Sequence, residues 1–431
     1  MAQQIVKLTF VGTEDVQLAT WTNLGANFAI QVAAVPSDGF GPIRPWITAR
    51  SQTTAVVNVS ARWQGVVYLT LIASSGAAAS TLTTLASSHY QIPTSFGSYA
   101  SVQTYVIQPW IAADVTMIRV RMRNMDYDSG INRGDVTGVS IGIGTSNGSF
   151  NYVGTPTVYS AITVPGGSDY VSAWTPVSRG ADGRLVIAYT VPASTNVAQT
   201  TGYNYQAMSV SGTASVNPIP VGTPGITNTL PYYLALELYT SKRRVVVIGD
   251  SIVAGYTNYF DRPGLGENYG YGLGIDRGYS VDSFGINGTQ LASYVDTVGR
   301  PWMMYSQNIL DTYVVVEAGV NDLPTQTLAQ YKVNIAAMIT LLQAAGARKI
   351  IWQTIMPQTA YPFDSLRQQV NAYIQAGVSG IDVVFDAATL MWDPANHSHI
   401  NPTYDSGDGI HPNATGQGVI EAALYTIISA L

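Results

Sequence analysis

Four short segments of the chain carry residue types suited to acyl transfer: "GDSI" at 249–252, "GINGT" at 285–289, "GVND" at 319–322 and "DGIH" at 408–411. A serine nucleophile needs a base that removes its proton, and the base needs a partner that fixes its tautomer. Ser251 is the candidate nucleophile, His411 the base and Asp408 its partner. The oxyanion that forms needs fixed hydrogen-bond donors. The side-chain amide of Asn321 and the backbone N–H groups of Gly288 and Ser251 are the candidates.

The elements that must position these residues are short apolar strands alternating with amphipathic helices. Strands are expected at 243–250, 311–319, 349–355 and 382–387. Helices are expected at 327–346, 363–377 and 414–430. The first of these helices has apolar residues at helical spacing and Gly346 as its stop. This alternation predicts a parallel sheet covered on both faces, with ligands bound beyond the carboxyl ends of the strands.

Residues 1–240 show no helical period and are expected to be β throughout. In the strand predicted at 117–125, Arg119, Arg121 and Arg123 alternate with apolar residues, as in a half-exposed antiparallel strand. Gly, Pro and Ser clusters recur at the roughly 8–12-residue spacing of β-sandwiches. We therefore expect three parts: a small β-rich module at 1–105, a β-sandwich or jelly-roll-like domain at 106–240 and an α/β domain at 241–431.

The four segments resemble blocks I, II, III and V of the SGNH (GDSL-type) hydrolases. The resemblance covers residues 241–431 and implies a flavodoxin-like α/β/α domain with serine esterase activity. The four named residues of that family would be Ser251, Gly288, Asn321 and His411, with Asp408 completing the triad. Block II is the least specific of the four, and Gly285 is the rival of Gly288 there. Asp250 is expected to support the turn structurally and to lie outside the triad.

A second serine motif, "GTSNG" at 144–148, satisfies the G-x-S-x-G pattern of a nucleophile elbow. That pattern needs a strand before it and a helix after it. Here Asn147 and Gly148 lie between two runs that are typical of strands, so we expect a hairpin turn and no catalytic role for Ser146.

Two other clusters raise the question of a metal. His397 and His399 lie near Asp393 and Asp405, but a polar loop is favoured over a metal site. The acidic segment 125–135 lacks the spacing and the final Glu of an EF-hand, so a surface loop is favoured over calcium. The serine mechanism needs no metal and no cofactor.

Composition limits the partners and the location. Charged residues make up 11% of the chain, the net charge is −6 and there is no cysteine, which excludes disulfides and thiolate zinc sites and argues against nucleic acid. No apolar run reaches the ~18–20 residues of a membrane span. The N-terminus shows no signal peptide, and the composition favours an extracellular or virion-associated location.

These observations predict a serine esterase that removes short acyl groups, with O-acetyl groups on a carbohydrate as its substrates. The resemblance extends to carbohydrate acetyl esterases that carry a β-sandwich region, and the Gly- and Tyr-rich segment 256–280 is expected to be a loop that contacts substrate. Two alternatives remain: a lipase or thioesterase, and a phage-tail or adhesin-type binding protein with the same fold. The substrate is an acylated carbohydrate or another small ester, and the oligomeric state stays open.

Overall fold

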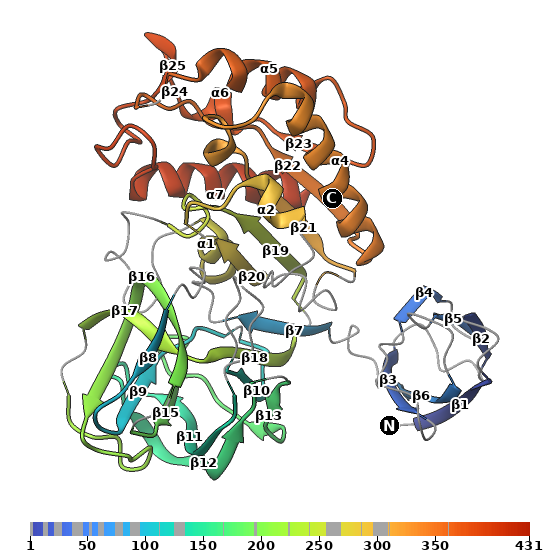
Figure 1. Cartoon of the computed structure of the whole chain (residues 1–431), viewed down its shortest axis with the longest axis vertical. Helices are drawn as coiled ribbons and strands as arrows, with labels where there is room; N and C mark the ends of the chain where they lie inside the picture. The colour runs from blue at the N-terminus through green and yellow to red at the C-terminus, as the bar shows by residue number, and fades with distance from the viewer. Residues whose placement is uncertain are drawn as a thin grey trace. The chain divides into compact units, whose positions relative to one another are not determined.

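The structure is a computed structural model, and most of the chain from residue 95 onward is described (Figure 1). The described residues are 3–11, 16–20, 28–36, 46–50, 54–58, 64–73, 81–86, 95–111, 113–124, 134–166, 168–193, 196–222, 225–240, 242–255, 269–285, 287–295, 309, 311–360 and 362–431. Backbone contacts divide the chain into two compact units, Met1–Thr81 and Leu82–Leu431.

The described residues of the first unit form two three-stranded antiparallel sheets. One has the order β1-β6-β3 and the other the order β2-β5-β4. The strands are β1 (Gln3–Val11), β2 (Val16–Thr20), β3 (Phe28–Pro36), β4 (Trp46–Arg50), β5 (Thr54–Asn58) and β6 (Gln64–Ala73).

Strands β7 to β18 form two antiparallel sheets that share one hydrophobic core. The first sheet contains β7 (Thr81–Ala86), β10 (Met117–Arg123), β13 (Tyr170–Val171), β14 (Thr175–Pro176) and β18 (Tyr233–Thr240). The second contains β8 (Ser95–Ser98), β9 (Gln103–Ile107), β11 (Val136–Ser146), β12 (Tyr152–Val164), β15 (Leu185–Val191), β16 (Asn196–Ser211) and β17 (Gly225–Pro231). The prediction of a β-rich region that resembles a sandwich is confirmed.

Strand β10 shows why this region forms a sandwich. Ile118, Val120 and Met122 are buried in the shared core, while the arginines between them are only partly covered. Arg121 lies 2.7 Å from Asp169 and also pairs with Glu237 of β18. One face of the strand therefore supplies the core, and the other carries ion pairs, as the alternation predicts.

The C-terminal part is built on a five-stranded parallel sheet with the order β20-β19-β21-β22-β23. Its strands are β19 (Arg244–Gly249), β20 (Ser280–Gly285), β21 (Tyr313–Glu317), β22 (Lys349–Gln353) and β23 (Val383–Phe385). This is the 2-1-3-4-5 order of flavodoxin-like folds, in which ligands bind where the strand order reverses. Here the reversal lies between β19 and β21, the strands that precede Ser251 and Asn321. The predicted flavodoxin-like domain is confirmed.

The helices contact one another in two groups, α7 with α1 and α6, and α4 with α2 and α5 (Figure 1). Their bounds are α1 (Tyr269–Ile275), α2 (Leu291–Val295), α4 (Leu328–Ala344), α5 (Asp364–Gln375), α6 (Ala387–Met391) and α7 (Ala414–Ser429). Thr327 and Gln330 form a capping box at the start of α4. Gly346, with φ of 84°, follows its end as predicted.

The segment 256–280 differs in part from the expected loop. The segment 256–280 is not a continuous loop, because Tyr269 and Leu273 are buried in the core and residues 269–275 form α1; residues 256–268 lie outside the described residues. The domain boundaries predicted at 105 and 240 stay predictions. Among the described helices, none combines the length and apolar character needed to cross a bilayer.

Candidate active site

Ser251 lies in the turn that directly follows β19. The four valine and isoleucine residues of that strand are fully buried, and Ser251 itself is 7% exposed. The turn is held locally, since Ala254 N–H donates to Asp250 O at 3.0 Å and Asp250 Oδ1 accepts the N–H of Ile252 at 3.0 Å. Asp250 therefore forms an Asx turn, which agrees with the structural role expected for it.

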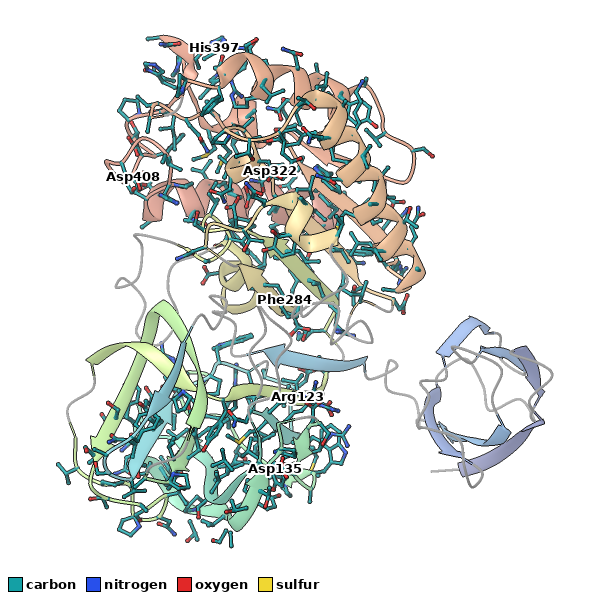
Figure 2. The ribbon with its side chains drawn as sticks, in the orientation of Figure 1. Arg123, Asp135, Phe284, Asp322, His397 and Asp408 are labelled. Atoms are coloured by element: carbon teal, nitrogen blue, oxygen red, sulfur yellow. The ribbon has the colours of Figure 1, made fainter. Side chains whose placement is uncertain are left out.

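The loop before α7 brings a histidine and a carboxylate to this serine. His411 Nε2 lies 2.8 Å from Ser251 Oγ, and His411 Nδ1 lies 2.6 Å from Asp408 Oδ2. The carboxylate favours the tautomer with a proton on Nδ1, which leaves Nε2 free to accept the Ser251 proton. Figure 2 labels Asp408 in this loop. The structure thus joins three residues that are up to 160 positions apart in the sequence.

Asp408 is held in its charged form. Partial burial would raise its pKa, but hydrogen bonds outweigh that effect: the N–H groups of Ile410 and His411 each donate to Asp408 Oδ1 at 2.9 Å, and the His411 ring faces Oδ2. The pKa of Asp408 is therefore lowered below its usual value. A carboxylate in this state can stabilise a cationic imidazole.

Gly288 and Asn321 come from neighbouring segments. Asn321 lies in the 3₁₀ turn Val320–Asp322 after β21, and its Nδ2 donates to Thr289 O at 3.2 Å. Gly288 has φ of 71°, a conformation that favours glycine. Gly285, the rival for block II, ends β20, where a Cβ atom would lie 2.2 Å from Ala254 N. Close packing against the Ser251 turn thus accounts for Gly285 being glycine.

Comparison with known proteins gives the family of this part of the chain. Residues 247–419 match the model of the GDSL-like lipase/acylhydrolase family. These residues form a GDSL-like acylhydrolase domain. The resemblance noted in the sequence is confirmed for this domain.

The chain is also similar to several solved structures. A member of the lipolytic protein G-D-S-L family from Veillonella parvula is 16% identical, covers 44% of this chain and 100% of its own, and has a TM-score of 0.35. A family 3 carbohydrate esterase from Talaromyces cellulolyticus is 16% identical over 44% of this chain and 97% of its own, with a TM-score of 0.33. A structure described as a GDSL-like lipase from Bacteroides ovatus is 12% identical over 77% of this chain and 84% of its own, with a TM-score of 0.31. The chain matches no curated protein.

Two residues of the acylhydrolase domain were missed by the sequence analysis. Gln417 of α7 donates from Nε2 to Ile252 O at 3.0 Å and accepts the N–H of Tyr269 at 3.0 Å, so it ties the serine turn to α1. Gln290 Nε2 donates to Asn321 O at 3.0 Å and thereby holds the Asn321 turn. Neither glutamine gives a sequence signal of its own, because the partners of each are distant in the chain.

Ser146, the second candidate serine, has different surroundings. Its Oγ accepts from Gln108 Nε2 and from Gly148 N–H, both at 2.9 Å, and donates to Asp182 Oδ2 at 3.1 Å. The chain then returns as β12, antiparallel to β11, so the motif is followed by a strand. The predicted hairpin is confirmed, and Ser146 is not followed by the helix that a nucleophile elbow requires.

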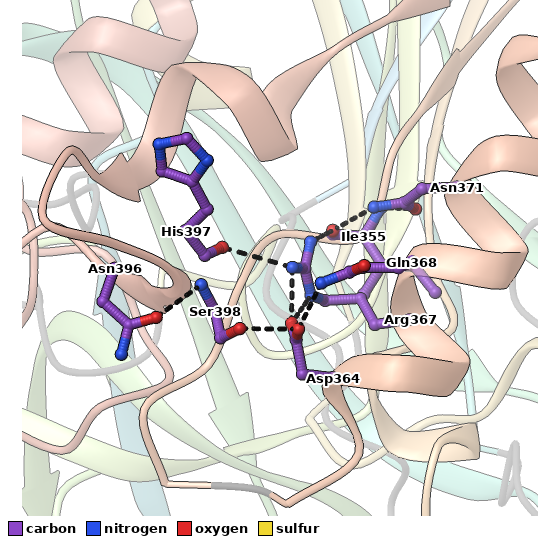
Figure 3. A network of polar contacts seen from close by, with 8 residues as sticks. All are labelled: Ile355, Asp364, Arg367, Gln368, Asn371, Asn396, His397 and Ser398. Carbon is purple, nitrogen blue, oxygen red and sulfur yellow. Dashed lines mark hydrogen bonds and ion pairs between the residues drawn. The ribbon is translucent and has the colours of Figure 1, made fainter.

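His397 and His399 lie in a hairpin that does not include Ser251, His411 or Asp408. The ring of His397 stacks on Trp392 at 3.8 Å, across β24 (Trp392–Asp393) and β25 (Asn396–Ile400). Figure 3 shows how this hairpin is fixed to α5: Ser398 Oγ donates to Asp364 Oδ2 at 2.7 Å, and Arg367 Nη2 donates to His397 O at 3.3 Å. These contacts hold the hairpin against α5, which gives this segment a structural role.

The carboxylates near His397 and His399 have local backbone partners. Asp393 Oδ1 accepts the N–H of Ala395 at 2.9 Å, and Asp405 Oδ1 accepts the N–H of Gly409 at 3.0 Å. Within the described part of the chain, no three His, Asp or Glu side chains are grouped as a metal site would need. Of the acidic segment 125–135, residues 125–133 lie outside the described residues.

Proposed function

We propose that this chain is a serine esterase that removes short acyl groups, with O-acetyl groups on carbohydrates as its substrate class. The observation that carries the proposal is the continuous hydrogen-bonded series of Ser251 Oγ, His411 Nε2, His411 Nδ1 and Asp408 Oδ2, with separations of 2.8 and 2.6 Å. A nucleophile, a base and an orienting carboxylate in this order are what acyl transfer to a hydroxyl requires. The acylhydrolase family of the domain supports the same chemistry.

In the proposed mechanism, His411 Nε2 takes the Ser251 proton as Oγ attacks the acyl carbonyl. The ester C–O bond then breaks, His411 returns the proton to the leaving alcohol, and an acyl-serine remains. Water, deprotonated by the same nitrogen, attacks the acyl-serine, and the carboxylic acid leaves as Ser251 recovers its proton. Asp408 stabilises the imidazolium in both steps.

The oxyanion of each tetrahedral intermediate is stabilised by Ser251 N–H, Gly288 N–H and Asn321 Nδ2. Support for Asn321 comes from its hydrogen bond to Thr289 O, which holds one amide proton and fixes the plane of the group. Donors fixed in advance do not need to reorganise during the reaction.

The carbohydrate part of the proposal is supported by composition. Only 11% of residues are charged and 10% are aromatic, and aromatic surfaces with little charge suit neutral sugars. A long acyl chain would instead need an apolar channel.

The test is a chain-length series of nitrophenyl esters followed by acetylated xylan and an acetylated capsular polysaccharide. We expect the highest kcat/KM with acetate, release of acetate from a polysaccharide, and loss of both in Ser251→Ala. A preference for long acyl chains would favour the lipase or thioesterase alternative. If wild type released no acid from any ester, the esterase proposal would fail and a binding function would take its place.

A further inference from the structure

The carboxyl groups of Glu317 and Asp250 are buried next to each other at the Ser251 turn. Glu317 is the last residue of β21 and pairs in register with Gly249, the last residue of β19. Its Oε2 accepts the N–H of Asp250 at 3.4 Å. Glu317 and Asp250 are 3% and 0% exposed. The Glu317 side chain therefore lies against the backbone that leads into Ser251.

The space around Gly249 shows how closely Glu317 approaches this backbone. A Cβ atom on Gly249 would lie 2.8 Å from Glu317 Oε2 and 2.2 Å from Glu317 O. Glycine at this position thus leaves room for the carboxyl group. Tyr294 of α2 donates its hydroxyl proton to Gly249 O, which fixes the same peptide from the other side.

The hydrogen bonds of the pair are incomplete unless one carboxyl carries a proton. Asp250 Oδ1 accepts from Ile252 N–H, but Asp250 Oδ2 is buried and, among the described residues, receives no hydrogen bond from a permanent donor. An ionised carboxylate only accepts hydrogen bonds, whereas a protonated one also donates. A proton on Glu317 would supply the donor that Asp250 Oδ2 lacks.

The surroundings favour a single negative charge on the pair. The titratable groups around it are Tyr269 of α1, Tyr294 of α2, Asp322 after β21, Tyr331 of α4 and, beyond Ser251, His411. Burial raises the pKa of Asp250, and the charge of Asp322 adds to this effect. Burial and the neighbouring Asp250 raise the pKa of Glu317 well above its usual value.

We propose that Glu317 is a positioning residue: as a neutral carboxylic acid it donates to Asp250 Oδ2 and accepts the Asp250 N–H, and so fixes the turn that presents Ser251. The pair holds one proton and one negative charge, and no proton leaves it during turnover. Its effect on rate rests on the proposed esterase function, but its effect on folding does not. Ionisation of Glu317 at high pH would place two anions beneath the turn and displace Ser251.

The activity test compares Glu317→Gln with Glu317→Leu. The glutamine amide donates permanently and cannot ionise, so we expect kcat/KM at pH 7 within about threefold of wild type, and activity that persists at alkaline pH where wild type declines reversibly. Leucine leaves Asp250 Oδ2 without a donor, so we expect kcat to fall about 10- to 100-fold with little change in KM. Glu421→Gln, at a buried carboxyl that pairs with Arg277 at 2.9 Å, is the matched control and should keep the wild-type pH profile.

The second readout is the melting temperature as a function of pH, which needs no substrate. Because the folded pKa of Glu317 is raised, its stabilising effect is complete below the unfolded value of about 4.5 and is lost as the pH rises toward the folded pKa. Wild type should therefore lose roughly 3 °C per pH unit relative to Glu317→Gln across this range. Parallel melting curves, or a Glu317→Leu enzyme with wild-type kcat and pH profile, would overturn the inference. If wild type hydrolyses no ester but the melting curves diverge, the esterase proposal alone fails.

Discussion

Ser146 and Ser251 are both buried serines at or just beyond the end of a strand, and both lie in a motif associated with nucleophiles. The hydroxyl of Ser146 has three hydrogen-bond partners within its own domain, Gln108, Gly148 and Asp182, and none of the three is a histidine. Ser251 instead faces the ring nitrogen of His411. The comparison shows that the base, and not the local motif, separates a candidate nucleophile from a structural hydroxyl.

The two sheets explain this difference. Strand β11 continues into β12 through the short connection at 147–151, so Ser146 is enclosed by this hairpin turn and by the segments that carry Gln108 and Asp182. Strand β19 lies where the order of a parallel sheet reverses, and such a position leaves space above the strand ends for loops from elsewhere in the chain. The loop that carries Asp408 and His411 uses this space.

The largest effect is expected from exchanging each serine for alanine in turn. Ser251→Ala should lower kcat/KM for nitrophenyl acetate by about 10⁶-fold, since it removes the attacking atom. Ser146→Ala should leave kcat/KM within about twofold of wild type. Steady-state kinetics of both variants measure this, and a large loss in Ser146→Ala would reverse the assignment.

Asp408→Asn should have the next largest effect. An amide cannot stabilise the imidazolium and favours the wrong tautomer of His411, so kcat should fall about 10⁴-fold. The matched change Asp182→Asn beside Ser146 should leave kcat unchanged. Equal losses in the two variants would show that Asp408 acts only through folding.

Asn321→Ala tests the proposed oxyanion donor. Loss of one fixed donor should lower kcat about 10²–10³-fold with a small change in KM. Asn413, which caps α7 by accepting the N–H of Gly416 at 3.0 Å, is a control for the loss of an amide in the same domain. Asn413→Asp should retain activity, because Asp also caps helices. An unchanged kcat in Asn321→Ala would remove this residue from the proposed site.

The smallest expected effect is on stability. Here Ser146→Ala should cause the larger loss, whereas Ser251→Ala causes the larger loss of activity. Ser146→Ala removes one partner from buried Gln108 and one from exposed Asp182. Because the Gln108 amide stays buried, the variant should lower the free energy of unfolding by about 1–3 kcal/mol. Ser251→Ala should be neutral or slightly stabilising, as is common for active-site residues. Urea unfolding of both variants gives the comparison, and equal midpoints would argue against a structural role for Ser146.

The sequence predicted the elements whose patterns are local. The helical spacing of Tyr331, Ile335 and Leu342 predicted α4, and all three are buried. The α1 helix was not predicted, because its three glycines are poor helix formers and its stability comes from burial of Tyr269 and Leu273.

The residues of the candidate site that lie in short motifs could be predicted from the sequence. Those that act through contacts between distant segments could not. Ser251, Asn321 and His411 lie in recognisable segments. Gln417 gave no signal, because its partner Ile252 is 165 residues away. Glu317 ends an apolar strand, and its contact with Asp250 could not be predicted without knowing that β21 lies beside β19.

The separation between Ser251 and His411 also has a consequence for the timing of synthesis. Ribosomes add about 5–20 residues per second, so the serine precedes its histidine by roughly 8 to 30 s for a separation of 160 residues. Gln417, which ties the serine turn to α1, is made later still. During that interval the nascent chain holds a serine without its base, and we expect it to be inert toward esters until α7 docks.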